Sequence, residues 1–132
     1  MTDPYFLIAD DSLEKTKLLL AAIHAVEWDI EIATAATSEE AYDVMKKRRV
    51  DFAFVDYYIP NMNGPWIIER LKNRNPDARV ALVSSSKKPS NLEEAIEAGA
   101  ETTLCTSDPA HVLASQLDTL LREWKGDGTM DA

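Results

Sequence analysis

Residues 52–65 read FAFVDYYIPNMNGP, a short apolar run that stops at a carboxylate and continues into a loop. The run Phe52–Val55 is typical of a buried strand, and Asp56 ends it. Proline, asparagine and glycine in the segment 57–65 favour a loop over a helix or a strand. Residues 5–11, YFLIADD, have the same form, since an apolar run again ends in acidic residues. The two stretches together predict buried strands that carry carboxylates at their ends.

Short apolar runs alternate with longer amphipathic stretches along the rest of the chain. We expect strands at Tyr5–Ala9, Ile30–Ala35, Phe52–Val55, Val80–Val83 and Thr102–Cys105. The spacing of the apolar residues predicts helices that begin near Ser12, Thr37, Trp66, Asn91 and Asp108. This alternation predicts an α/β fold, in which right-handed crossovers join a parallel sheet that has helices on both faces.

Two helix ends carry specific signals. Thr37 and Glu40 have the spacing of a capping box, in which each side chain satisfies a free backbone N–H group. Gly99 follows the helix that ends at Ala98, in the place where a left-handed residue commonly ends a helix. We predict one domain over residues 1–125 and a disordered polar tail over residues 126–132.

The 132 residues include 14 Lys and Arg against 23 Asp and Glu, which gives a formal net charge of −9. An acidic surface repels nucleic acid, so we expect no nucleic-acid partner. No apolar run approaches the ~20 residues of a membrane span, so we expect no membrane partner either. The single cysteine, Cys105, excludes an internal disulfide and agrees with a cytoplasmic location. The acidic surplus should instead attract cations, including divalent metals.

Acidic and hydroxyl side chains lie at the predicted ends of three strands. Asp10 and Asp11 follow the first strand, Asp56 follows the third, and Ser84 follows the fourth. Taken singly, each could cap a helix or begin a turn. Taken together, they converge on the strand ends where open α/β sheets bind ligands, which favours a functional site.

Clustered carboxylates raise one another's pKa unless a positive charge lies among them. Oxygen ligands of this kind suit Mg²⁺, which keeps several of its waters when it binds. A carboxylate beside Mg²⁺ can act as a nucleophile toward phosphorus, because the metal neutralises charge on the phosphoryl oxygens. The residues therefore predict a metal-dependent pocket that accepts a phosphoryl group.

The chain resembles the receiver domain of two-component response regulators, of the chemotaxis-regulator type, over about Tyr5 to Trp124. The resemblance rests on the acidic pair Asp10–Asp11, the segment 56–64 (DYYIPNMNG), Ser84 and the segment 97–100 (EAGA). It implies a flavodoxin-like, doubly wound sheet of five parallel strands in the order 2-1-3-4-5. It also implies that the protein is not an enzyme and promotes only its own phosphorylation and dephosphorylation.

The resemblance also implies roles for the residues at the strand ends. Asp56 would accept a phosphoryl group from a phosphohistidine on a histidine kinase or a histidine phosphotransfer protein. Asp11, Asp56 and the backbone carbonyl of Tyr58 would hold Mg²⁺, and Asp10 would act through water. Ser84 would donate a hydrogen bond to the phosphoryl group. Signalling would follow through a downstream protein partner or through onward transfer of the phosphoryl group, as in a phosphorelay.

Two positions depart from the family pattern. Receivers usually carry a lysine at the end of the fifth strand, where this chain has Thr106, and many place an aromatic residue where this chain has Thr103. The missing lysine predicts a phosphorylated pocket that is more negative by about one charge. Lys87 or Lys88 could supply a cation from the loop after the fourth strand, although solvated loop residues are the simpler interpretation. These departures put the family's usual switching mechanism in question.

Tyr58 and Ser86 resemble the variable positions that flank the phosphoryl group and govern the access of hydrolytic water. A bulky Tyr58 predicts a shielded acyl phosphate with a long lifetime.

Other classes of protein fit the residues less well. A phosphatase with an aspartate nucleophile would want a second acid where Tyr58 stands, and a flavin- or nucleotide-binding protein would want a glycine-rich loop after the first strand. The main alternative is a pseudo-receiver, a protein-interaction module that works without phosphorylation and has lost the lysine together with the chemistry. The clustered carboxylates and Ser84 favour the phospho-receiver.

Overall fold

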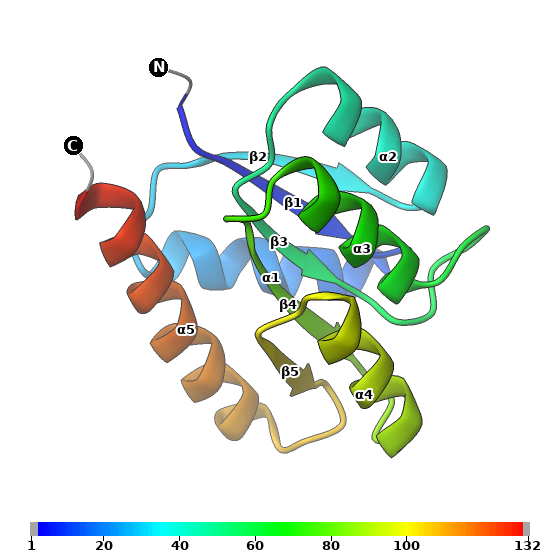
Figure 1. Ribbon diagram of the computed structural model, residues 1–132. Helices are drawn as coiled ribbons and strands as arrows, with labels where there is room; N and C mark the ends of the chain where they lie inside the picture. Colours follow the sequence, from blue (N-terminus) through cyan, green and yellow to red (C-terminus); the bar gives the residue numbers. More distant parts are fainter. Residues whose placement is uncertain (1–2, 131–132) are drawn as a thin grey trace.

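The computed structural model describes residues 3–130, in which five strands alternate with five helices. The strands are β1 (Tyr5–Ala9), β2 (Glu31–Ala35), β3 (Phe52–Val55), β4 (Arg79–Ser84) and β5 (Thr102–Cys105). The helices are α1 (Leu13–Ala25), α2 (Ser38–Lys47), α3 (Gly64–Arg74), α4 (Pro89–Ala98) and α5 (Ala110–Met130). All strands pair in parallel in the order β2-β1-β3-β4-β5, so the expected α/β fold and strand order are confirmed (Figure 1).

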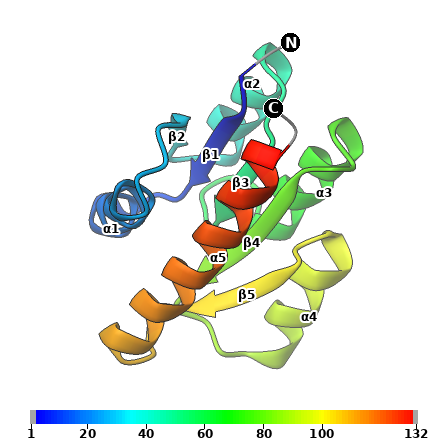
Figure 2. The same ribbon diagram turned by 90° about the vertical axis from the view of Figure 1, so that its left-hand side faces the viewer.

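The sheet forms the middle of three layers. Helices α1 and α5 cover one face, while α2, α3 and α4 cover the other (Figures 1 and 2). Successive side chains of a strand point to opposite faces, so β1 sends Phe6 and Ile8 toward α1 and α5, and Leu7 and Ala9 toward the other layer. Because both faces are covered, the central strands are apolar throughout, which is why they were recognisable as unbroken apolar runs.

Bulky rings fill the layer between the sheet and the helices α1 and α5. We call this group the aromatic cluster, and it consists of Phe6, Trp28, Phe52, Phe54 and Trp124. Their ring centroids lie 4.8 to 6.0 Å apart, in edge-to-face, tilted and stacked arrangements. Aromatic side chains of this size supply much of the apolar area that a core buries. The cluster therefore fixes β1 and β3 side by side.

Local capping signals in the sequence are borne out. The Thr37 hydroxyl accepts a hydrogen bond from the backbone N–H of Glu40, and the Glu40 carboxylate accepts one from the backbone N–H of Ala36. Gly99 ends α4 with φ at 127°, in the region that favours glycine. These signals fix where α2 begins and where α4 ends.

The end of α5 differs from the sequence-based expectation. Its helical backbone continues to Met130, through residues 126–130 of the segment predicted as a disordered tail, and residues 131 and 132 lie outside the described part. No proline follows Pro109 to interrupt the backbone hydrogen bonds, and Gly126 and Gly128 each cost a helix only about 1 kcal/mol. None of the described helices, α5 included, is long and apolar enough to cross a bilayer.

Candidate functional site

Three carboxylates gather beyond the ends of β1 and β3. Ala9 pairs with Val55 in the sheet, and the backbone N–H of Asp56 donates to the Ala9 carbonyl at 2.9 Å, so the residues after both strands lie next to each other. Asp10 and Asp56 are buried, with 5% and 8% exposure, while Asp11 is exposed. One oxygen from each of these aspartates lies within 4.8 Å of the others. We call these residues the carboxylate cluster, and the expected convergence of Asp10, Asp11 and Asp56 is confirmed.

The backbone around Asp56 requires a glycine at the start of α3. A Cβ atom on Gly64 would lie 2.2 Å from the Asp56 carbonyl oxygen, closer than atoms can approach. The backbone N–H of Gly64 donates to the Tyr57 carbonyl at 2.8 Å, and the Asn63 side chain caps α3 by accepting from the N–H of Trp66. The glycine in the segment 56–64 therefore allows α3 to begin against the residue that carries the carboxylate.

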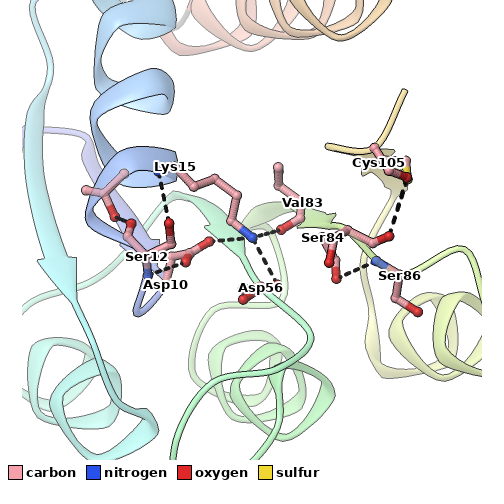
Figure 3. Close-up of polar contacts among 11 residues, drawn as sticks. Asp10, Ser12, Lys15, Asp56, Val83, Ser84, Ser86 and Cys105 are labelled. Carbon is pink, nitrogen blue, oxygen red and sulfur yellow. Dashed lines mark hydrogen bonds and ion pairs between the residues drawn. The ribbon is translucent and has the colours of Figure 1, made fainter. Parts of the chain in front are cut away.

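A lysine from α1 lies inside the carboxylate cluster. The Lys15 ammonium is 2.7 Å from Oδ2 of Asp10 and 3.0 Å from Oδ1 of Asp56, and it donates a hydrogen bond to the Val83 carbonyl at 3.0 Å (Figure 3). Its side chain is only 13% exposed. The expectation drawn from Thr106, that this pocket lacks a compensating cation and is more negative by about one charge, is therefore wrong.

Sequence reasoning missed Lys15 because it resembles any solvated lysine of an amphipathic helix. One signal could have identified it. Ser12 caps α1 through the backbone N–H of Lys15, so the lysine lies in the first helical turn. The positive end of the helix dipole disfavours a cation there. A lysine in that turn, a few residues after the pair Asp10–Asp11, indicates that nearby carboxylates hold its charge, and the structure shows that these are Asp10 and Asp56.

Asp10 remains electrostatically strained despite its neighbours. Its Oδ1 accepts from the backbone N–H of Ser12 at 2.8 Å, whereas its buried Oδ2 accepts no well-aligned hydrogen bond from the described residues and faces the Lys15 ammonium. Burial raises the pKa of the Asp10 carboxyl above its usual value of 3.8, and the Asp56 charge adds to this. The Lys15 ammonium and the Ser12 N–H offset only part of the pKa increase. The pocket therefore has room for more positive charge.

The carboxylate cluster fits a hard divalent cation. It offers only oxygen donors, their oxygens lie within 4.8 Å of one another, and three carboxylates outnumber the single ammonium among them. Mg²⁺ prefers such donors and tolerates partial coordination by water.

A chain of hydrogen bonds joins the residues expected to flank the site. The amide of Asn91 donates to the Tyr58 hydroxyl at 3.0 Å and to the Ser86 hydroxyl at 2.9 Å. The Ser84 hydroxyl, buried at the end of β4, accepts from the backbone N–H of Ser86 at 3.2 Å (Figure 3). The structure thus brings Tyr58 and Ser86 together through Asn91, which sequence reasoning did not single out.

The two residues that depart from the family pattern, Thr103 and Thr106, lie on β5 and directly after it. Thr106 is half-buried and lines, together with Lys15 and Asp56, one end of a groove of about 860 Å³ between α1 and α5. Thr103 is half-buried within β5. The suggestion that Lys87 supplies the missing cation fails, because its ammonium pairs with Asp108 at 2.8 Å.

Lys88, the other lysine considered for that role, is exposed at the N-terminal cap of α4. In the part of the chain that the structure describes, no hydrogen bond or ion pair joins its ammonium to the carboxylate cluster.

Comparison with known proteins identifies the family of this arrangement. A family model described as the response regulator receiver domain matches residues 6–114. A protein-glutamate methylesterase/protein-glutamine glutaminase of Geobacter metallireducens is 34% identical over 102 residues, which cover 74% of this chain and 29% of that protein. Sporulation initiation phosphotransferase F of Bacillus subtilis is 29% identical over 102 residues, which cover 77% of this chain and 81% of that protein.

A solved structure shows the same fold at lower identity. The signal receiver domain of an HD domain-containing protein from Pseudomonas fluorescens matches with a TM-score of 0.82 at 17% identity, over 99% of this chain and 93% of that one. The chain spans between 29% and 55% of the length of several curated relatives that it matches. In those relatives the matched region is therefore one part of a longer protein.

Proposed function

The chain belongs to the response regulator receiver family, and from this premise we propose that it accepts a phosphoryl group on Asp56 from a phosphohistidine donor. The observation that carries the proposal is the carboxylate cluster, in which buried Asp56 lies within 4.8 Å of oxygens of Asp10 and Asp11. A protein-interaction module that works without phosphorylation has no need of buried, mutually repelling carboxylates.

The proposed reaction is a direct transfer between two side chains. A carboxylate oxygen of Asp56 attacks the phosphorus, and a new P–O bond forms as the P–N bond to the donor histidine breaks. The electron pair of that bond leaves with the imidazole nitrogen, which then takes up a proton. Ser84, buried at the end of β4, would donate a hydrogen bond to a phosphoryl oxygen. The product stays on Asp56, so the chain promotes its own phosphorylation and does not turn over a released substrate.

The carboxylate cluster would hold the Mg²⁺ that this transfer needs. Asp11, Asp56 and the backbone carbonyl of Tyr58 would be ligands, and Asp10 would act through water. When bound, Mg²⁺ would neutralise charge on the phosphoryl oxygens. The raised pKa of Asp10 and the excess of carboxylate over ammonium support this assignment.

The donor would be a histidine kinase or a histidine phosphotransfer protein, and the output would be a downstream protein partner or onward transfer. The surface of α1 beside the cluster supports a protein partner, because Leu13 and Leu18 there are 68% and 45% exposed. Exposed apolar side chains next to a reactive group are typical of a surface that another protein covers.

Intact-mass measurement after incubation with Mg²⁺ and acetyl phosphate tests the proposal. The wild type should gain one phosphoryl adduct, and Asp56→Asn should gain none because the attacking carboxylate is lost. Asp43→Asn, at an exposed position on α2, should behave as the wild type. A folded wild type that forms no adduct with acetyl phosphate or with a phosphorylated histidine phosphotransfer protein would contradict the proposal and favour the pseudo-receiver.

A further inference from the structure

We propose that Lys15 is the cation that binds the phosphoryl group on Asp56, in place of the strand-five lysine that this chain lacks at Thr106. The inference rests on the proposed function, since it assigns a residue to the same transfer. It adds that the cation comes from the first turn of α1, a different element from the one used by other family members.

The position of the ammonium carries the argument. Lys15 Nζ lies 3.0 Å from Oδ1 of Asp56, the group that would carry the phosphoryl, and 2.7 Å from Oδ2 of Asp10. The Val83 carbonyl, at 3.0 Å, accepts a hydrogen bond from the same nitrogen. Contacts from three sides hold the charge beside Asp56 before any phosphoryl group arrives. Small rotations of the flexible lysine stem would then allow Nζ to meet a phosphoryl oxygen, in a charge-assisted hydrogen bond.

The placement of Lys15 is unfavourable without its carboxylate partners. A cation in the first turn opposes the helix dipole, and its side chain is only 13% exposed. Two carboxylates offset these costs, and the Ser12 hydroxyl fixes the start of the helix by accepting a hydrogen bond from the backbone N–H of Lys15. A charge that is already oriented and partly desolvated requires little rearrangement when negative charge develops nearby.

Other side chains near the site fit this role less well. Thr106 carries no charge, and the Lys87 ammonium is engaged by Asp108 at 2.8 Å. Lys88 is exposed at the start of α4. The pocket therefore keeps the number of internal cations that the family pattern provides, although the cation comes from another element.

Besides binding the phosphoryl group, Lys15 should weaken the binding of the metal. Its ammonium lies between Asp10 and Asp56, so it competes with a divalent cation for the same carboxylate charge. Removal of Lys15 should therefore strengthen Mg²⁺ binding while it weakens phosphoryl transfer. A residue that merely supports the fold would weaken both.

The decisive experiment compares Lys15→Met with the wild type. Methionine keeps most of the apolar stem and loses the charge. We expect the rate of adduct formation from acetyl phosphate to fall at least about tenfold, and Mg²⁺ affinity, measured by calorimetry, to rise several-fold. Lys17→Met, at an exposed position on the same helix, is the matched control and should change neither quantity. Thermal melts monitored by circular dichroism check that each variant is folded.

A second variant tests whether charge, and not packing, is what Lys15 supplies. Thr106 lines the same end of the groove as Lys15 and Asp56, so the double variant Lys15→Met/Thr106→Lys should recover part of the lost rate. Thr106→Lys alone should bring little gain, because Lys15 already provides the cation.

The outcomes separate this inference from the proposed function. An unchanged rate in Lys15→Met would overturn the inference and leave the proposed function intact. A parallel fall in rate and Mg²⁺ affinity, or no recovery in the double variant, would show that Lys15 has a structural role and would also overturn the inference. If the wild type itself formed no adduct, the proposed function would fail and the inference with it.

Discussion

The aromatic cluster and the carboxylate cluster lie at opposite ends of the same two strands, and their physical chemistry is opposite. Phe6, near the start of β1, packs among rings, and Asp10 follows the end of that strand; β3 begins at Phe52, and Asp56 follows its end. At the first end, close-packed rings bury apolar area and stabilise the fold. At the second end, buried carboxylates repel one another, and the pKa of Asp10 is raised. The strands are thus stabilised at one end, and at the other end they carry carboxylates that are costly to bury.

Each of the two clusters contains one buried polar atom that lacks a good hydrogen-bond partner, and the consequences differ. The buried indole N–H of Trp124 has no hydrogen-bond partner among the described residues. That cost is small beside the area that a fully buried tryptophan removes from water, so the ring stays in the core. At the carboxylate cluster, the poorly satisfied Oδ2 of Asp10 faces the Lys15 ammonium at 2.7 Å instead. Under the proposed function, this carboxylate would act on the metal through a water.

The largest expected effect comes from breaking the aromatic cluster. Trp124→Ala should lower the free energy of unfolding by about 3–5 kcal/mol, because it leaves a large cavity among Phe6, Phe52 and Phe54. Urea denaturation followed by circular dichroism measures this change. Trp66→Ala is the control: that ring is half-buried on α3, so the loss should be clearly smaller. Equal losses at the two positions would contradict the role given to the aromatic cluster.

A substitution in the carboxylate cluster is expected to change stability less than Trp124→Ala does, and to increase it. Asp10→Asn should raise the melting temperature of the metal-free protein by a few degrees at neutral pH, because it removes a buried charge. The folded pKa of Asp10 lies above its ordinary value of 3.8, so the wild type loses stability as pH rises from 3.8 through the raised pKa. The gain from Asp10→Asn should therefore vanish below that window.

Thermal melts at a series of pH values measure the difference in melting temperature between Asp10→Asn and the wild type. Saturating Mg²⁺ should reduce that difference, because it stabilises the wild type. Asp43→Asn, which is exposed on α2, controls for the general effect of removing one negative charge. A destabilised Asp10→Asn at neutral pH would mean that the ion pair with Lys15 outweighs the cost of burying Asp10.

The smallest expected change in stability accompanies a change in chemistry. Tyr58 is 60% exposed, so Tyr58→Asn should leave the melting temperature nearly unchanged while it shortens the lifetime of the acyl phosphate several-fold by admitting water. The loss of adduct after removal of the phosphodonor measures this lifetime. Tyr58→Phe keeps the ring but loses the hydrogen bond from Asn91, so it separates shielding from anchoring. An unchanged lifetime in Tyr58→Asn would refute the shielding hypothesis.

Much of the fold and part of the site were predictable from local patterns. Strands such as Phe52–Val55 are recognisable because buried parallel strands are apolar on both faces. The convergence of Asp10 and Asp56 follows from topology, since parallel strands end at the same edge. The helical continuation past Gly126 was not predictable, because a polar, glycine-containing segment is compatible with either helix or coil.

The residue pattern by itself determined the parallel α/β sheet and its acidic edge, while the strand order and the absence of the strand-five lysine at Thr106 followed from the resemblance to the receiver family. Only the tertiary structure decided which cation offsets the negative charge of that edge. Lys15 and Asp56 are far apart in the chain, and they meet through a flexible side chain. Patterns of apolar residues report which backbone elements form and pack, whereas the direction of a long charged side chain depends on the charges that the fold places around it. The sequence correctly showed that no lysine follows β5, but the conclusion that the pocket lacks a cation was wrong.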